Sequence, residues 1–215
     1  MDLPLRLFSA RTMLQTARDI LSAGGWVMYP LLALSLISAT LTFERLLFWA
    51  KHRAGASASL LSKLREAGGD RAKARRSASE SPTVYGRFAS VALAGESSGA
   101  EAHDLQAALD TVRPSIERFG ATMSAVITGA PMMGILGTVI GIIESFRLLG
   151  AEGPVTDPTQ IAGGIAQALY TTAFGLVIAL LTLFPHAIFR ARSERCLDQL
   201  EVIGAVLAAP TKSDD

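Results

Sequence analysis

The feature that most constrains this chain is a run of residues without formal charge near its C-terminal end. The run lies between Asp157 and Arg190 and is 32 residues long. A helix of that length reaches about 48 Å at roughly 1.5 Å per residue, whereas the hydrocarbon core of a bilayer is about 30 Å thick. The run therefore predicts a membrane-spanning helix that extends beyond the bilayer.

Two further uncharged runs, at residues 20–43 and 119–143, are also long enough to cross a membrane. Half of the 215 residues are apolar, and the mean hydropathy is +0.36. These observations predict an all-α membrane protein with three transmembrane helices and long cytoplasmic helical extensions. The first apolar run begins too late and is too long for a cleavable signal peptide, so we expect it to stay as an anchor.

The predicted segments follow from these runs and from the polar stretches between them. They are an N-terminal periplasmic amphipathic helix (1–25), transmembrane helix 1 (26–50), a cytoplasmic helical segment (51–118), transmembrane helix 2 (119–149), a periplasmic loop (150–158), transmembrane helix 3 (159–189), and a cytoplasmic C-terminal helix and tail (190–215).

The cytoplasmic segment shows helical spacing of apolar residues at 57–67, at 83–93 and from residue 102 onward. Gly68-Gly69 marks a break, and the basic run 71–76 is predicted to be a solvated loop, with attraction to the anionic headgroups of membrane lipid as the alternative. At the end of the first span, Glu44 and Arg45 are expected at the headgroup level, where an arginine side chain reaches toward water.

Orientation follows from the distribution of lysine and arginine. Basic residues flank the spans in the segment 51–118 and in the tail, whereas the connection 149–157 has none. We therefore expect a multi-pass protein with the N-terminus outside and the C-terminus in the cytoplasm.

Small residues recur at helical spacing within the second and third spans. Such stripes let two helix backbones approach closely. The glycines assigned to helix packing are Gly134, Gly137, Gly141, Gly164 and Gly175.

Polar side chains inside the same spans are the candidate functional residues. Polar groups at membrane depth are unfavourable unless they face protein or water. The candidates for an ion pathway are Thr138, Gln167, Thr171 and Thr172. The alternative is that the threonines bond to their own helix backbones and that Gln167 joins helices. Glu144 is a possible ionisable group near the outer end of span two, or one half of an ion pair with Arg147.

Known catalytic and metal-binding patterns are missing from the sequence. There is no HExxH, no GxSxG and no phosphate-binding glycine loop that opens a helix after a strand. The single cysteine excludes an internal disulfide, and the three histidines are far apart. With a net charge of +1, the chain is not expected to bind nucleic acid. We expect neither an enzyme nor a metal or other cofactor.

Two long motifs carry a family resemblance. Residues 131–146 read PMMGILGTVIGIIESF, and residues 161–186 read IAGGIAQALYTTAFGLVIALLTLFPH. They resemble the P-x-x-G-x-x-G-T-V-x-G and I-A-x-G-I-A-E-A-L-x-x-T-A-x-G-L patterns of the MotA/TolQ/ExbB proton channel family. Three predicted spans make the chain more similar to ExbB and TolQ than to the four-span MotA.

The resemblance implies a ring, a homopentamer that holds a dimer of an ExbD/TolR-like single-span partner in its lumen and acts indirectly on a TonB/TolA-like protein. It also implies a location in the bacterial inner membrane, and hence a periplasmic N-terminus. Thr138 and Thr172 would face the pore. The family's glutamate in span three falls on Gln167, which cannot titrate. Whether protons or sodium ions drive the complex therefore stays open.

The functional hypothesis is a ring subunit of an inner-membrane motor or stator complex driven by the proton motive force. Such a complex energises outer-membrane processes such as TonB-dependent import or Tol-Pal envelope maintenance. The alternatives are a non-conducting membrane scaffold that anchors a single-span partner, and a stand-alone ion channel. The sequence does not distinguish nutrient import, envelope maintenance and motility.

Overall fold

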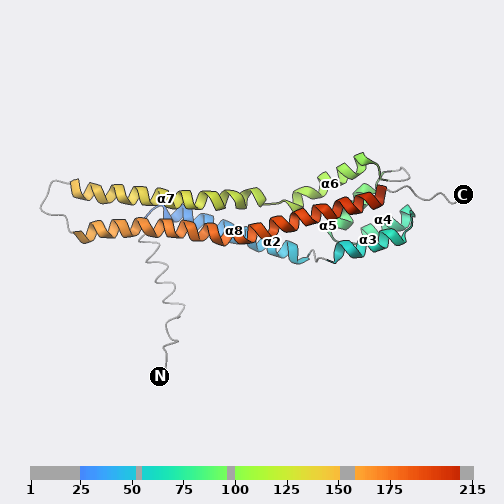
Figure 1. The fold of residues 1–215 in the computed structure, drawn as a ribbon, viewed down its shortest axis with the longest axis horizontal. Coiled ribbons are helices and arrows are strands. Elements are labelled where there is room, and N and C mark those ends of the chain that lie inside the picture. The colour runs from blue at the N-terminus through green and yellow to red at the C-terminus, as the bar shows by residue number, and fades with distance from the viewer. Residues whose placement is uncertain (1–24, 52–54, 96–99, 151–157, 209–215) are drawn as a thin grey trace, which may run out of the picture. The chain divides into compact units, whose positions relative to one another are not determined.

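The structure is a computed structural model that describes residues 25–51, 55–95, 100–150 and 158–208, without the side chains of residues 148–150, 158 and 160. All regular secondary structure in these ranges is helical (Figure 1). The predicted N-terminal amphipathic helix, most of the predicted loop 150–158 and the end of the tail lie outside the described residues.

The described helices are α2 (Met28–Lys51), α3 (Ala56–Glu66), α4 (Arg71–Ser79), α5 (Val84–Ala92), α6 (Ala102–Ile116), α7 (Gly120–Gly150) and α8 (Pro158–Ala208). The chain forms two compact units. We call residues 1–42 with 121–186 the span unit, and residues 43–120 with 187–215 the multi-helix unit. Helices α2 and α8 contribute to both.

The span unit contains the long apolar parts of α2, α7 and α8. Three helices of the described chain are long and apolar enough to cross a membrane. The predicted all-α fold with three spanning helices is thereby confirmed, whereas the ring stays a prediction. Helices α7 and α8 continue through Pro131 and Pro185 respectively, each as one element.

The core of the span unit lies where all three helices meet. Its buried members are Val27, Met28, Leu31, Val126, Ala130 and Ile178. Many other large apolar side chains point outward, among them Met132, Val139, Leu169 and Leu181, which are 49–70% exposed. Such exposed apolar faces are unfavourable in water and indicate surfaces that meet lipid or protein.

A buried hydrogen bond joins α2 to α8 inside the span unit. The oxygens of Ser38 and Thr182 are 2.5 Å apart, and the two residues are 6% and 0% exposed. Thr182 donates its proton to the carbonyl of Ile178 at 2.7 Å, so Ser38 is the donor to Thr182. Buried hydroxyls need such partners because an unpaired one is unfavourable in an apolar surrounding.

The core of the multi-helix unit is built from apolar positions three or four residues apart. On α6 these are Ala108, Val112 and Ile116, none more than 1% exposed. On α8 they are Cys196, Leu200, Ile203 and Leu207. The helices predicted at 57–67, at 83–93 and from residue 102 are confirmed as α3, α5 and α6.

The prediction of a loop at the basic run 71–76 was wrong, because these residues belong to helix α4. Asp70 is its N-cap, and the side-chain oxygen accepts a hydrogen bond from the backbone N–H of Lys73 at 3.1 Å. Ala74 and Ala78 form a narrow buried face. A capping aspartate and good helix formers suffice where only two small side chains need burial.

Arg45 is also placed differently from the sequence prediction. Instead of reaching toward headgroups, its side chain is 3% exposed. Its Nη1 donates to the carbonyls of Ser115 and Ile116, both at 3.1 Å, and its Nε to Glu44 Oε2 at 2.9 Å. These carbonyls belong to the last turn of α6, where the helix itself offers no donors. Arg45 therefore caps α6.

A polar group joins α5 to α8 within the multi-helix unit. The Tyr85 hydroxyl donates to Gln199 Oε1 at 2.6 Å. Burial raises the pKa of Tyr85 above its ordinary value, with a contribution from Cys196. Burial also raises the pKa of the Cys196 thiol. Both groups are therefore neutral near pH 7, and Cys196 is not an activated nucleophile.

We predict that Arg45→Met lowers the stability of the multi-helix unit by about 1–3 kcal/mol, because buried carbonyls lose their charged donor. The measurement is the thermal unfolding midpoint of the purified protein in detergent. Arg113→Gln is the matched control, since its pair with Glu117 is about half exposed and contributes about 0–1 kcal/mol. Equal midpoints for the two variants would contradict the capping role.

We also predict a pH-dependent contribution from Cys196. Because its folded pKa is raised, the unfolded chain loses the thiol proton first, and the contribution to stability declines as pH rises through the ordinary thiol value of about 9. The free energy of unfolding of the wild type, relative to that of Cys196→Ala, should therefore be constant up to about pH 8 and decrease above it. A difference independent of pH from 7 to 10 would refute the prediction.

Candidate functional site

The candidate site lies where α7 and α8 touch inside the span unit. Five glycines line this contact: Gly134, Gly137 and Gly141 on α7, and Gly164 and Gly175 on α8. A Cβ on Gly134 would come within 2.9 Å of the Thr171 carbonyl oxygen and the Thr172 Cα. A Cβ on Gly175 would come within 2.5 Å of the Ala130 carbonyl oxygen. No side chain fits there, so the backbones approach directly.

Three threonine hydroxyls converge on one backbone carbonyl across this contact. The oxygen of Gly134 lies 2.9 Å from Thr172 Oγ1, 3.3 Å from Thr171 Oγ1 and 3.5 Å from Thr138 Oγ1. The hydroxyls of Thr138 and Thr172 are 3.1 Å apart. The sequence placed these residues on two helices, and the structure brings all three together.

The protons of these hydroxyls have nearby carbonyl acceptors. Thr138 donates to Ile135 O at 2.7 Å, and Thr171 donates to Ala168 O at 2.7 Å. Thr172 donates to Gly134 O, so the unshared electron pairs of Thr138 and Thr172 are left to face each other or a third group. The result is a neutral site rich in oxygen, which can accept a hydrogen bond or help to solvate a cation.

The three threonine side chains differ in how far they are exposed. Thr171 is 1% exposed, and its side chain fills the space left by Gly137. Thr138 and Thr172 are half-buried at the edge of the contact. Of these three threonines, Thr138 and Thr172 are the two that are open to a further group.

Gln167 does not join the threonine pair in the structure. Its Nε2 lies beside Gly25, three residues before α2 begins, where an added Cβ would be 2.7 Å away. Gln167 and Thr172 are five residues apart, which corresponds to about 140° around a helix. The amide therefore faces the α2 side of α8, and the pair faces another side.

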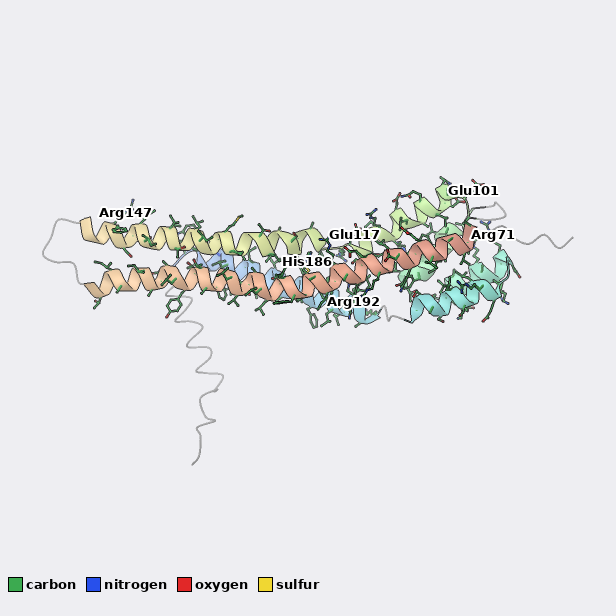
Figure 2. All side chains as sticks on the ribbon, viewed as in Figure 1. Arg71, Glu101, Glu117, Arg147, His186 and Arg192 are labelled. Atoms are coloured by element: carbon green, nitrogen blue, oxygen red, sulfur yellow. The ribbon has the colours of Figure 1, made fainter. Side chains whose placement is uncertain are left out.

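Glu144 is exposed on α7. Figure 2 labels Arg147 near the end of α7, one turn beyond Glu144. The side-chain ion pairs within the described ranges do not join these two residues. The neighbouring Ser145 is instead 3% exposed and lies against Gly164.

The described residues contain no group of three His, Cys, Asp or Glu side chains that could hold a metal ion.

Sequence reasoning missed the buried Ser38–Thr182 hydrogen bond and the role of Arg45. A signal for the first was available, because Thr182 follows Thr171 by eleven residues and lies on the same face of a helix. No comparable signal pointed to Arg45, since its carbonyl partners lie about seventy positions further along the chain.

Comparison with known protein families shows the family to which the protein with this site belongs. The MotA/TolQ/ExbB proton channel family matches residues 80–202, which is more than half of the 215-residue chain. The chain belongs to this family. The match includes the whole α7–α8 contact, and with its three apolar helices this family member is a membrane protein.

Individual relatives of the MotA/TolQ/ExbB family extend the similarity over most of the chain. The putative biopolymer transport protein ExbB-like 1 of Synechocystis sp. is 32% identical over 200 residues, covering 90% of this chain and 79% of the relative. ExbB-like 3 of the same organism is 30% identical over 174 residues, covering 79% and 82%. The Tol-Pal system protein TolQ of Pseudomonas aeruginosa is 36% identical over 93 residues, covering 43% and 40%.

We predict that Gly134→Ala destabilises the span unit by about 1–3 kcal/mol, because the added methyl group meets backbone atoms that cannot yield. Gly129→Ala is the control, since nothing lies within 4 Å of its added Cβ and alanine favours a helix by up to about 1 kcal/mol. Unfolding in sodium dodecyl sulfate measures both. A neutral Gly134→Ala would show that the helices are not in close contact.

Proposed function

We propose that the chain is the ring subunit of an inner-membrane motor or stator complex of ExbB/TolQ type, driven by ion flow. The observation that carries the proposal is the half-buried pair Thr138 and Thr172, whose oxygens are 3.1 Å apart. The pair lies at the edge of a glycine-lined helix contact within the residues that match the proton channel family.

In the proposed assembly, five copies form a ring through the outward apolar faces of the spans. The lumen holds a dimer of a single-span partner similar to ExbD or TolR. The exposed apolar side chains of α7 and α8 support such contacts, because a helix pair with this surface is stable only in lipid or against protein. The N-terminus is periplasmic and the C-terminus cytoplasmic in this proposal.

Thr138 and Thr172 line the ion path in the proposed complex, and Thr171 supports them from inside the helix contact. Gln167 cannot carry a proton, and the described part of span three contains no carboxylate before Glu194. Glu144 of span two lies near the outer end of its helix, so the titrating group in this proposal is an aspartate of the partner helix. The membrane potential acts on the moving charge with about 2.3 kcal/mol per 100 mV.

The proposed task is to energise processes at the outer membrane through a TonB- or TolA-like protein. Relatives named as biopolymer transport proteins and as a Tol-Pal system protein support this task. The choice between import and envelope maintenance follows from the partner. The first observation to make is therefore the reading frame next to this gene. We expect it to encode a short protein with one membrane span and an aspartate within that span.

One observation favours the alternative of a non-conducting scaffold. The hydroxyls of Thr138, Thr171 and Thr172 all have backbone carbonyls as acceptors, as do threonines that only pack membrane helices. A functional test must therefore separate the loss of a hydroxyl from the loss of packing.

We predict that Thr172→Val lowers proton flux at least about tenfold in liposomes that contain the chain and its partner, which corresponds to about 1.4 kcal/mol. Valine keeps the shape of threonine but removes the oxygen. Thr172→Ser should retain most of the flux. Thr128→Val is the control, since its exposed hydroxyl bonds only to Ser124 O of its own helix.

Full flux in Thr172→Val would reject the ion-path role of this residue. A complex that forms but never conducts would support the scaffold, and equal flux without the partner would support a stand-alone channel. Repeating the measurement with a sodium gradient at equal pH on both sides identifies the coupling ion.

A further inference from the structure

A second site with the chemistry of a binding pocket lies in the multi-helix unit. It is a cavity of about 440 Å³, a size typical of small-molecule sites. Its walls come from the last turn of α2, the end of α4, the start of α5 and the face of α6. It is lined entirely by residues of that unit.

The lining of this cavity combines hydroxyl-bearing and apolar residues, and its charge is positive only. Five residues contribute hydroxyl groups: Ser79, Ser81, Thr83, Ser90 and Ser115. Arg87 is the one ionisable side chain of the lining, and no carboxylate is among the lining residues. Ser79, Ser90 and Ser115 donate their hydroxyl protons to backbone carbonyls, and Ser81 and Thr83 bond to each other, which leaves one hydroxyl proton of that pair. This hydroxyl together with the Arg87 guanidinium suits a phosphate group, because arginine binds two phosphate oxygens at once.

The Arg87 guanidinium is available for a ligand. It is exposed, and the ion pairs of the described residues leave it out. Glu80 lines an adjoining cavity of about 220 Å³, which shares Ser81 and Pro82 with this one and is also lined by Lys63. The lining of the cavity itself places no carboxylate beside Arg87.

Further positive charge lies behind the aromatic wall of the cavity. The Phe48 ring lines it, and the buried Arg45 guanidinium lies 4.4 Å from that ring. Arg45 and Arg118 share one carboxylate, that of Glu44, at 2.9 Å and 3.8 Å. These two arginines and one glutamate leave a net charge of +1 near this wall, which favours an anionic occupant.

The position of Phe48 indicates where the anion comes from. Phe48 lies in the last turn of α2, three residues before the helix ends at Lys51. An aromatic residue followed by a basic one is the arrangement found where a span leaves the hydrocarbon core. A lipid headgroup is therefore a chemically suitable source of the anion, and Phe48 offers an apolar surface beside the phosphate-binding groups.

We propose that this cavity binds the phosphate headgroup of an anionic phospholipid, with Arg87 as its principal ligand. One hydroxyl of the Ser81–Thr83 pair donates to a remaining phosphate oxygen, and Phe48 contacts the glycerol end of the lipid. This site is separate from the threonine pair, and its test does not depend on ion flux.

The test is native mass spectrometry of the full chain, titrated with phosphatidylglycerol. Arg87→Gln should weaken binding at least about fivefold, because a charge-assisted bidentate contact is lost. The matched control is Arg75→Gln, which removes an equal charge from an exposed position on α4 outside the cavity. The control should change binding less than about twofold, since surface charge at a distance is screened.

Two further ligands and one further variant complete the test. Ser90→Leu should weaken phosphatidylglycerol binding by filling the cavity while the charge of Arg87 stays. Phosphatidylcholine should bind more weakly than phosphatidylglycerol, and free glycerol 3-phosphate should not displace the lipid. Equal effects of Arg87→Gln and Arg75→Gln, no loss in Arg87→Gln, or equal binding of phosphatidylcholine would overturn the proposal. Displacement by free glycerol 3-phosphate would reassign the cavity to a soluble phosphate.

Discussion

The close approach of α7 and α8 is the constraint on which the rest of the span unit depends. In a membrane no hydrophobic force drives two apolar helices together, so van der Waals contact and hydrogen bonds must do so. Where α7 has glycine at position 134, the backbone of α8 would touch an added Cβ at 2.9 Å. The missing side chain also opens the Gly134 carbonyl to the Thr172 hydroxyl of α8, which donates to it at 2.9 Å. The glycine at position 134 thus permits both the close packing of the two helices and the hydrogen bond between them.

The chemistry that results is neutral. The threonines offer oxygen atoms but no group that titrates near pH 7, and Gln167 lies beside Gly25 instead. Charge that crosses the proposed complex must therefore arrive from elsewhere. In this proposal the threonine pair solvates the moving charge, whereas a titrating group of the partner carries it.

The multi-helix unit follows a different rule, because its strongest interactions lie at helix ends. Arg45 supplies donors to two carbonyls that α6 cannot satisfy itself, and Asp70 does the same for an N–H at the start of α4. Arg45 has a further consequence, since its charge lies behind the Phe48 ring that lines the hydroxyl-rich cavity. One buried arginine thereby stabilises a helix end and contributes to the positive potential of a neighbouring surface.

The sequence by itself determined that the protein is helical and has three spans, because insertion into a membrane depends on length and charge along one helix. It also identified α3, α5 and α6 from apolar spacing, but it missed α4, whose buried face consists of two alanines. Only the tertiary structure decided that Thr171 is enclosed, that Thr138 and Thr172 meet, and that Gln167 and Arg45 face other partners. The reason is physical. Periodicity places a side chain around its own helix, whereas a contact depends on the distance and rotation of a second helix, which no single segment encodes.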